Sequence, residues 1–225
     1  MMWCFMLLNW SNIDTVLLDM DGTLLDLRFD NYFWTTHLPL RYSELFESDL
    51  SIAKQSLIRR LEEKSGTLDW YSTEFWSREL CLDIVALKRE VKYLIRERPN
   101  VSKFLMDLGN KGKERILVTN ADRNSIEIKF AETTIYQNLD KIFSSHDLGY
   151  PKEHHKFWSG LQKTLVFDPL KTLFIDDSEA MLLAAKEFGV ANLFTIARPD
   201  SSGSLCQTSG FVALHDFDEL NVSNC

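Results

Sequence analysis

Five short apolar runs, each ending in polar residues, constrain the fold of this chain more than any other feature. They lie at residues 15–18, 115–120, 141–145, 172–177 and 191–196. A strand buried on both faces has this nearly continuous apolar composition, whereas a half-exposed strand alternates apolar and polar residues. We therefore predict five buried strands of a parallel sheet.

Segments of helical periodicity separate these runs. Residues 101–109 and 181–189 each carry apolar side chains three and four positions apart and end in a glycine, as helices commonly do. Strands that alternate with helices predict an α/β fold with a doubly wound parallel sheet. In such sheets ligands bind outside the carboxyl ends of the strands.

One long segment interrupts the alternation. Residues 26–98 contain no clear strand, and their periodic apolar positions indicate helices, namely Leu50, Ala53, Leu57 and Leu61, and then Leu80, Ile84, Leu87 and Val91. We predict a helical cap domain at residues 26–98, inserted into a core domain made of residues 1–25 and 99–225. After Pro99, Asn100 is expected to cap the next helix, and residues 211–220 to pack back on the core.

Polar side chains stand at the ends of three predicted strands and should converge on one site. Residues two apart in an extended segment project to the same side, so Asp19 and Asp21 can address one substrate. One carboxylate can attack the substrate while the other carries a proton. The residues predicted to meet there are Asp19, Asp21, Thr119, Asn120, Asp176 and Asp177.

The predicted site holds an excess of carboxylates. Asp176 and Asp177 would repel the other acids unless a cation lay among them, and all-oxygen ligands favour Mg²⁺. Lys152 follows a Gly-Tyr-Pro turn. Together with Thr119, it offers positive charge and hydrogen-bond donors to phosphate oxygens.

Each of these residues also has an ordinary structural explanation. An Asp that ends a strand is often a turn or helix-capping residue, and a single lysine such as Lys152 is usually a solvated surface side chain. Their joint occurrence, in this order and each at the end of a buried strand, favours a functional site.

Composition limits the partners of the chain. Its 225 residues include 25 Lys and Arg against 33 Asp and Glu, a formal charge of −8, so we expect no nucleic-acid partner. The uncharged residues 1–13 are too short to span a membrane and carry no signal-peptide pattern, which predicts a cytoplasmic protein. The cysteines are far apart in sequence and are expected to be reduced thiols, namely Cys4, Cys81, Cys206 and Cys225.

With these residues in hand, the chain resembles the haloacid dehalogenase-like hydrolase superfamily. Residues 19–26, DMDGTLLD, match the first motif of that family, DxDGTLxD, without a mismatch. Thr119 and Asn120 match the second motif, Lys152 the third, and residues 174–178 the double-acid form of the fourth. The predicted insertion after the first motif is similar to the helical cap of that family.

The resemblance implies a role for each matching residue. Asp19 would be the nucleophile that forms an aspartyl phosphate, and Asp21 the acid and base. Mg²⁺ would be held by Asp19, the main-chain carbonyl of Asp21 and the acids of the fourth motif. Because most relatives have Gly-Asp there, Asp177 is assigned direct ligation and Asp176 a water-mediated role. Thr119, Asn120 and Lys152 would bind the transferring phosphoryl group.

The resemblance also implies a substrate. Dehalogenases lack an acid at the position of Asp21, because a halide leaves without a proton, so the second acid indicates a phosphate ester. Residues 25–34, LDLRFDNYFW, and residues 149–153, GYPKE, are similar to the bacterial GMP/IMP 5′-nucleotidase branch of the superfamily. The implied partner is a small phosphorylated metabolite, a purine nucleotide.

Two alternatives stay open at this point. Aromatic residues at 32–34, 70–71 and 75–76 either stack on a base or only form the core of the cap. If they are core only, the enzyme is a broad phosphatase of sugar phosphates or phosphoglycolate. A non-enzymatic receiver-like domain would also combine paired acids, Mg²⁺, Thr and Lys. The sequence indicates no oligomeric state.

Overall fold

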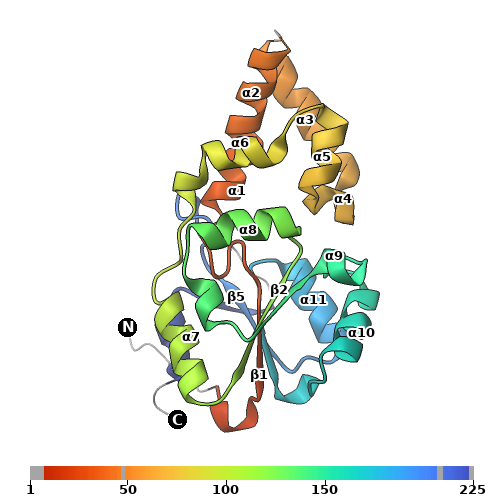
Figure 1. Cartoon of the computed structure of the whole chain (residues 1–225). Coiled ribbons are helices and arrows are strands. Elements are labelled where there is room, and N and C mark those ends of the chain that lie inside the picture. The colour runs from red at the N-terminus through yellow and green to blue at the C-terminus, as the bar shows by residue number, and fades with distance from the viewer. Residues whose placement is uncertain (1–7, 47–48, 207–209, 223–225) are drawn as a thin grey trace.

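A parallel sheet of six strands forms the centre of the computed structural model, which describes residues 8–46, 49–206 and 210–222 (Figure 1). The strand order is β3-β2-β1-β4-β5-β6 and every neighbouring pair is parallel. This confirms the predicted α/β fold. The strands are β1 Thr15–Leu18, β2 Glu114–Thr119, β3 Lys141–Ser144, β4 Thr172–Ile175, β5 Asn192–Ile196 and β6 Val212–Leu214.

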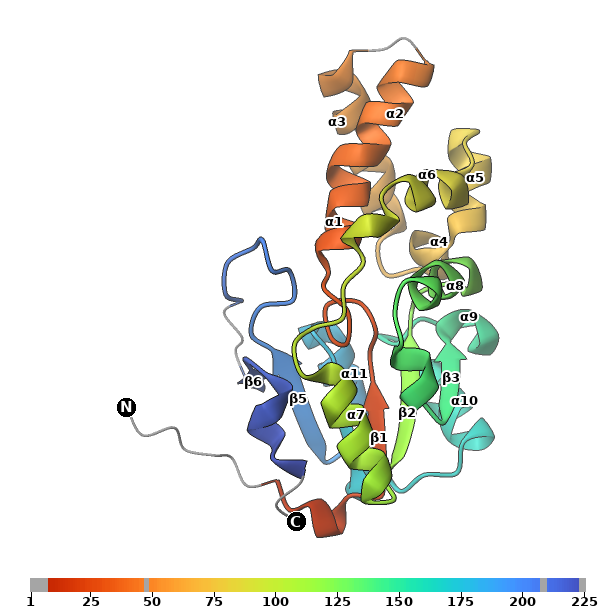
Figure 2. The same ribbon diagram turned by 60° about the vertical axis from the view of Figure 1, so that its left-hand side comes forward.

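Helices cover both faces of the sheet, which explains the apolar composition of its strands (Figure 2). Successive side chains of β1 point to opposite faces. Val16 and Leu18 join the cluster that contains α7 and α8, whereas Leu17 packs with α10 and α11. The core helices are α7 Val101–Asn110, α8 Arg123–Ala131, α9 Ser145–Leu148, α10 His155–Thr164 and α11 Glu179–Phe188.

A group of helices stands above the carboxyl ends of the strands, at the top of Figure 1. A π-helical turn, Phe33–His37, joins α1 to α2, so the helical backbone continues from one to the other without a break. Such π turns often mark functional positions in helices. The helices of this cap are α1 Arg28–Tyr32, α2 Leu38–Leu45, α3 Leu50–Lys64, α4 Leu68–Tyr71, α5 Thr73–Leu80 and α6 Ile84–Glu90.

Short 3-10 helices complete the described structure. They occur in the cap and at the edges of the core, at Trp10–Asn12, Lys92–Leu94, Ile135–Asn138, Pro169–Lys171 and Phe217–Leu220. The last one bears out the expectation for residues 211–220, because Phe217 and Leu220 are buried and the Trp10 indole Nε1 donates to the Leu220 carbonyl at 2.7 Å.

The two connections between core and cap run side by side (Figure 2). Leu25 forms an antiparallel bridge with Glu97. The Asp26 amide donates to the Arg96 carbonyl and the Arg98 amide to the Leu24 carbonyl, both at 2.9 Å. The chain therefore enters and leaves the cap through one paired ribbon. The boundaries predicted at residues 26 and 98 remain a prediction.

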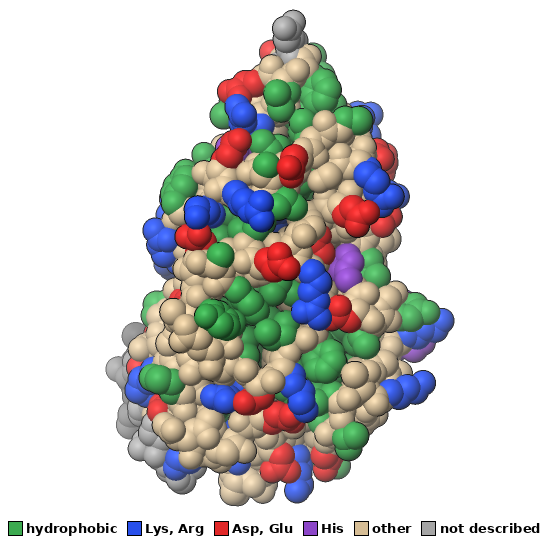
Figure 3. Space-filling view, viewed as in Figure 1, with side chains coloured by type: hydrophobic (Ala, Val, Ile, Leu, Met, Phe, Trp, Pro, Cys, Tyr) green, Lys and Arg blue, Asp and Glu red, His purple; other side chains and the backbone are tan. Residues whose placement is uncertain are grey.

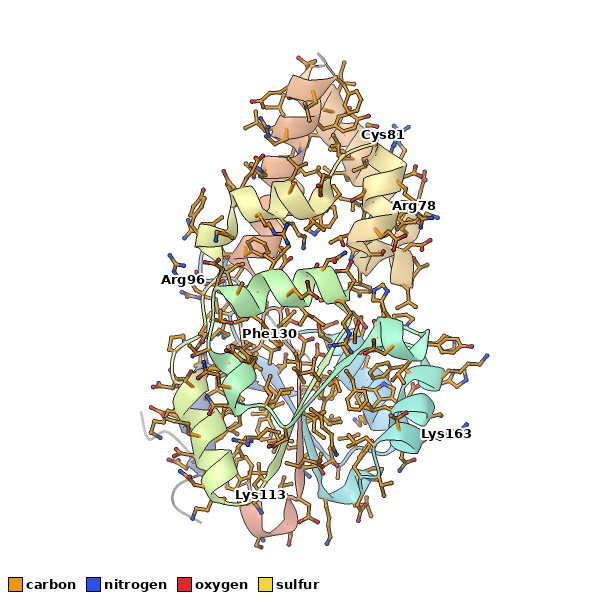
Figure 4. The ribbon with its side chains drawn as sticks, in the orientation of Figure 1. Arg78, Cys81, Arg96, Lys113, Phe130 and Lys163 are labelled. Atoms are coloured by element: carbon orange, nitrogen blue, oxygen red, sulfur yellow. The ribbon has the colours of Figure 1, made fainter. Side chains whose placement is uncertain are left out.

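The apolar residues Leu80, Ile84 and Leu87 fall on two helices instead of one, and Val91 follows the end of the second. Cys81 adopts the left-handed conformation (φ 53°) and ends α5, and Figure 4 shows it at this turn. The Asp83 side chain then accepts from the Ala86 amide and starts α6. An N-terminal cap inside the periodic segment thus breaks the helix that periodicity alone predicts.

Asn100 begins α7 as expected, but its side chain does not cap the helix. The residue is left-handed (φ 60°), and its Nδ2 donates to Asp216 Oδ1 at 2.8 Å. Asn100 therefore links the start of α7 to the C-terminal segment of the core.

Among the described residues, no helix is both long and apolar enough to cross a membrane. Cys81 and Cys206 are free and exposed. Cys4, Cys225 and the first part of the uncharged N-terminal segment lie outside the described residues. Acidic and basic side chains are interspersed over the face shown in Figure 3.

Candidate active site

The carboxyl ends of β1, β2 and β4 open into a cavity of about 290 Å³ between core and cap. The structure brings together at this cavity all the residues predicted for the site, namely Asp19, Asp21, Thr119, Asn120, Lys152, Asp176 and Asp177. The reason is the sheet order: β1 lies between β2 and β4, so the residues that follow these strands are neighbours.

Lys152 is the central cation of the site. Its Nζ contacts Asp19 Oδ1 and donates to Asp176 Oδ2 at 2.7 Å and to the Val118 carbonyl at 3.2 Å. The residue is only 2% exposed, so the surface-lysine explanation is wrong. Burial would lower the pKa of Lys152, but the carboxylates of Asp176 and Asp19 raise it, and the ammonium stays charged.

The loop that carries Lys152 is held by residues of the site itself. Asn120 Oδ1 accepts from the Lys152 amide at 2.9 Å, and Asn120 Nδ2 donates to Glu153 Oε2 at 3.0 Å. The Trp158 indole donates to the Lys152 carbonyl at 2.8 Å. Thr119 Oγ1 accepts from the Ala121 amide at 3.1 Å. The side chain of Asn120 thus positions Lys152.

A tight turn after β1 places Gly22 against the side chain of Asp177. Gly22 has φ +84°, and a Cβ atom there would lie 2.3 Å from Asp177 Oδ2. Only glycine accommodates both this conformation and this approach. Gly22 of the first motif is therefore required for two reasons: its backbone forms the turn, and the absence of a side chain leaves space for the Asp177 carboxylate.

The carboxylates of Asp19, Asp176 and Asp177 fit a divalent cation. One oxygen of each lies within 4.8 Å of the others. Burial, and then the charges of Asp176 and Asp19, raise the pKa of Asp177 well above its usual value. Carboxylate oxygens are the protein ligands that Mg²⁺ prefers.

The two neighbouring acids of the fourth motif differ in their surroundings. Asp176 Oδ2 accepts from Lys152 Nζ and Asp176 Oδ1 from the Ser178 amide at 2.9 Å. In the described part of the chain the Asp177 carboxylate has no hydrogen-bond partner. Asp177 therefore has the carboxylate that is free to ligate a cation.

Sequence reasoning missed a second group of charges beside Asp21. Lys129 Nζ lies 2.6 Å from Asp21 Oδ1 and 2.7 Å from Asp30 Oδ2, and Lys88 Nζ lies 3.0 Å from Asp30 Oδ1. Asp30 is part of the run at residues 25–34, which is one available signal. Another is that Lys129 stands three positions after the buried Ile126, on the buried face of α8.

Cap and core also meet through hydrogen bonds from neutral donors of the cap to carboxylates of the core. Asp122 Oδ2 accepts from the Thr73 amide at 2.6 Å and from Thr73 Oγ1 at 2.5 Å. The Tyr71 hydroxyl donates to Glu153 Oε1 at 3.2 Å. These contacts hold α4 and α5 of the cap against the loops that carry the site.

The aromatic residues of the cap serve two purposes. Phe33 and Trp76 are buried, at 0% and 1% exposure, and form the core of the cap. Trp34, Trp70 and Tyr71 line the cavity instead. The core explanation therefore applies to Phe33 and Trp76, whereas stacking of the cavity-lining rings on a base stays a prediction.

The chain belongs to the haloacid dehalogenase-like hydrolases, whose family model matches residues 13–189. Its sheet order also differs from the 2-1-3-4-5 order of receiver domains, so the receiver-like alternative is wrong. Among characterised relatives, the GMP/IMP nucleotidase YrfG of Escherichia coli K12 is 38% identical over 211 residues, covering 94% of this chain and 95% of that protein. The Shigella flexneri protein of the same name matches equally.

Solved structures support the fold. The crystal structure of a HAD phosphatase from Thermococcus onnurineus has a TM-score of 0.76 at 18% sequence identity, covering 93% of this chain and 96% of that one. The family model confirms the resemblance of the motifs to the superfamily. The 38% identity confirms their resemblance to its nucleotidase branch.

The metal-free protein should become more stable as the pH falls from 7.5 to 5. Burial raises the pKa of both Asp19 and Asp21 to about 6, above the usual 3.8, so the native state binds protons more tightly than the unfolded chain. In EDTA, we expect the melting temperature to rise by several degrees between these two pH values, at about 2–4 °C per kcal/mol. A melting temperature that is flat or falls toward pH 5 contradicts this assignment.

Gly22→Ala should abolish Mg²⁺ binding by displacing Asp177, and this effect can be separated from backbone strain. Gly66 has a similar φ of +76°, but a Cβ atom there would have nothing within 4 Å, so Gly66→Ala is the matched control. The left-handed backbone should cost each variant about 1–2 kcal/mol in unfolding free energy. Only Gly22→Ala should also displace Asp177 and remove the Mg²⁺-induced rise in melting temperature. Equal behaviour of the two variants contradicts the argument.

Proposed function

We propose that this hydrolase is a Mg²⁺-dependent 5′-nucleotidase that releases phosphate from purine nucleoside 5′-monophosphates such as GMP and IMP. The observation that carries the proposal is the 38% identity to a GMP/IMP nucleotidase over nearly the full length of both proteins. The charge and lining of the cavity support it. We also propose that the protein acts in the cytoplasm, which its widely spaced cysteines favour.

Asp19 is the nucleophile in this proposal. Its carboxylate oxygen attacks phosphorus, the bond from phosphorus to O5′ breaks, and the electron pair of that bond leaves with O5′. The product is an aspartyl phosphate and the nucleoside. The contact with Lys152 Nζ keeps the Asp19 carboxylate directed into the cavity.

Asp21 is the acid and base. Its carboxyl group gives a proton to the departing O5′ and then takes one from the water that attacks the phosphorus of the aspartyl phosphate. This second step restores the Asp19 carboxylate and releases phosphate. The pKa of about 6 for Asp21, raised by burial, lies near the neutral range in which a group can both donate and accept.

Lys152 offsets the charge of the phosphoryl group in this proposal, and the Thr119 hydroxyl donates a hydrogen bond to it. A transferring phosphoryl group spreads negative charge over its oxygens, and fixed donors stabilise that charge. Asn120, also predicted to bind phosphate, acts in this proposal by orienting Lys152 through its side chain. Mg²⁺, held by Asp19, Asp177 and the Asp21 main-chain carbonyl with Asp176 behind them, would neutralise further charge on the phosphoryl oxygens.

The cap side of the cavity is suited to a planar base. Trp34, Trp70 and Tyr71 line it from the cap and Asp19 lines it from the core, so a nucleotide with phosphate at Asp19 can extend its base toward these rings. The volume of about 290 Å³ lies at the lower end of the roughly 300–1,000 Å³ range of small-molecule sites. The broad phosphatase remains the competing candidate, since a small phosphate ester would use the same carboxylates.

A phosphate-release screen tests the proposal directly. With Mg²⁺, we expect the highest kcat/KM for GMP and IMP, lower values for sugar phosphates and phosphoglycolate, and no turnover in EDTA. Asp19→Asn should lower kcat at least about a thousand-fold, as removal of a nucleophile does. Asp14→Asn, at an exposed aspartate before β1, is the matched control and should retain full activity. Ready hydrolysis of sugar phosphates without release from GMP or IMP would favour the broad phosphatase.

Replacement of a cavity ring should reduce nucleotide selectivity. Base stacking contributes about 1–3 kcal/mol, so Trp34→Ala should lower kcat/KM for GMP by roughly 5- to 150-fold. Hydrolysis of phosphoglycolate, which has no base, should change little. Tyr93→Ala, at a 58% exposed cap residue outside the cavity lining, serves as the control. Unchanged selectivity in Trp34→Ala would show that the ring is core only.

A further inference from the structure

A buried lysine bridges the cap and the proposed acid–base residue. Lys129 lies on α8 of the core. Its Nζ lies 2.6 Å from Oδ1 of Asp21, in the turn that follows β1. The same Nζ donates at 2.7 Å to Oδ2 of Asp30, which lies on α1 of the cap. The side chain of Lys129 is 2% exposed, so this ammonium is removed from water and depends on these two carboxylates.

The cap contributes Asp30 and a second lysine to this cluster. Asp30 Oδ1 accepts from Lys88 Nζ, on α6 of the cap, at 3.0 Å. Asp30 is therefore held between two lysines, one from each side of the cavity. Lys129 can share Asp30 only while the cap lies over the core, because α1 and α8 belong to different parts of the fold.

The contact fixes one oxygen of Asp21. Asp21 Oδ1 is buried and has no aligned hydrogen bond among the described residues, so the ion pair with Lys129 is what holds it. The other oxygen is left for the substrate. Lys152, in contrast, contacts Asp19 and Asp176, so the two buried lysines serve different carboxylates.

We propose that Lys129 is a positioning residue that holds the Asp21 carboxylate for proton transfer, and that Asp30 makes this hold depend on the cap lying over the core. The inference rests on the proposed function, because it requires Asp21 to be the acid. Burial alone would lower the pKa of Lys129, but the carboxylates of Asp21 and Asp30 raise it by more than burial lowers it. The ammonium therefore stays charged.

The proposal predicts a dependence on the leaving group. A nucleoside alkoxide must receive a proton as it leaves, and a positioned acid contributes about 10²–10⁴-fold to such a step. Acetate and p-nitrophenolate leave as stable anions and need no proton. Loss of Lys129 should therefore slow nucleotide hydrolysis and spare acetyl phosphate and p-nitrophenyl phosphate.

The test compares kcat/KM for these substrates in Lys129→Met, because kcat/KM reports the steps up to release of the leaving group. We expect a loss of at least about ten-fold for IMP and GMP, and less than about three-fold for the activated substrates. The ratio of two substrates measured on one preparation is independent of the fraction of folded enzyme. Lys129→Arg, which keeps the charge, should restore part of the nucleotide activity.

Two more variants test the coupling to the cap. Asp30→Asn keeps the size of the side chain and should give the same selective loss, to a smaller extent. It also carries the test if Lys129→Met does not fold. Lys92→Met is the matched control, because Lys92 and Glu132 form an exposed ion pair between cap and core at 2.7 Å, away from the cavity. Its ratio should equal that of the wild type.

A parallel loss on all substrates in Lys129→Met, or no loss on nucleotides, would overturn the positioning role. An unchanged ratio in Asp30→Asn would overturn the dependence on the cap. Failure of the proposed function is distinguishable from both, because it appears in the wild type as absence of phosphate release from GMP and IMP. In that case the same ratio is measured with whichever alkyl phosphate the wild type hydrolyses.

Discussion

Repulsion among carboxylates is the constraint on which the rest of this site depends. Asp19 follows β1 and Asp176 and Asp177 follow β4, and the two strands are neighbours in the sheet, so their acids are forced together. Lys152 offsets part of this charge from within the core, and a divalent cation is the simplest way to offset the remainder. The hydrogen bonds of Asn120 and Trp158 to the Lys152 main chain then serve to keep that ammonium in place.

How much of this could be predicted from sequence depends on the range of each interaction. The strands and the residues that end them were predictable, because burial on both faces leaves a continuous apolar run and the polar end marks the edge of the sheet. The pair formed by Lys129 and Asp30 was not, because its members are 99 positions apart and depend on how the cap lies on the core. Sequence pattern likewise could not separate buried Trp76 from Trp34, which lines the cavity, because an aromatic side chain suits both a cap core and a cavity wall.

The core residues that bind the cap also make hydrogen bonds within the core. Asp122 starts α8 by accepting from the Ser125 amide, and its second oxygen accepts from Thr73 of the cap. Glu153, beside Lys152, accepts from both Asn120 and Tyr71. Movement of the cap would therefore disturb the same hydrogen bonds that orient the phosphate-binding side of the site.

The paired ribbon formed by Leu25 and Glu97 has a consequence for how such proteins diversify. Because the two crossings lie side by side, the ends of the inserted segment are adjacent, and the core meets it as it would meet a long surface loop between β1 and α7. Closing a longer or shorter loop changes the conformational entropy only slowly with length. Insertions of very different size can therefore be exchanged at this point in evolution while the order of the strands, and with it the cluster of acids, is left intact.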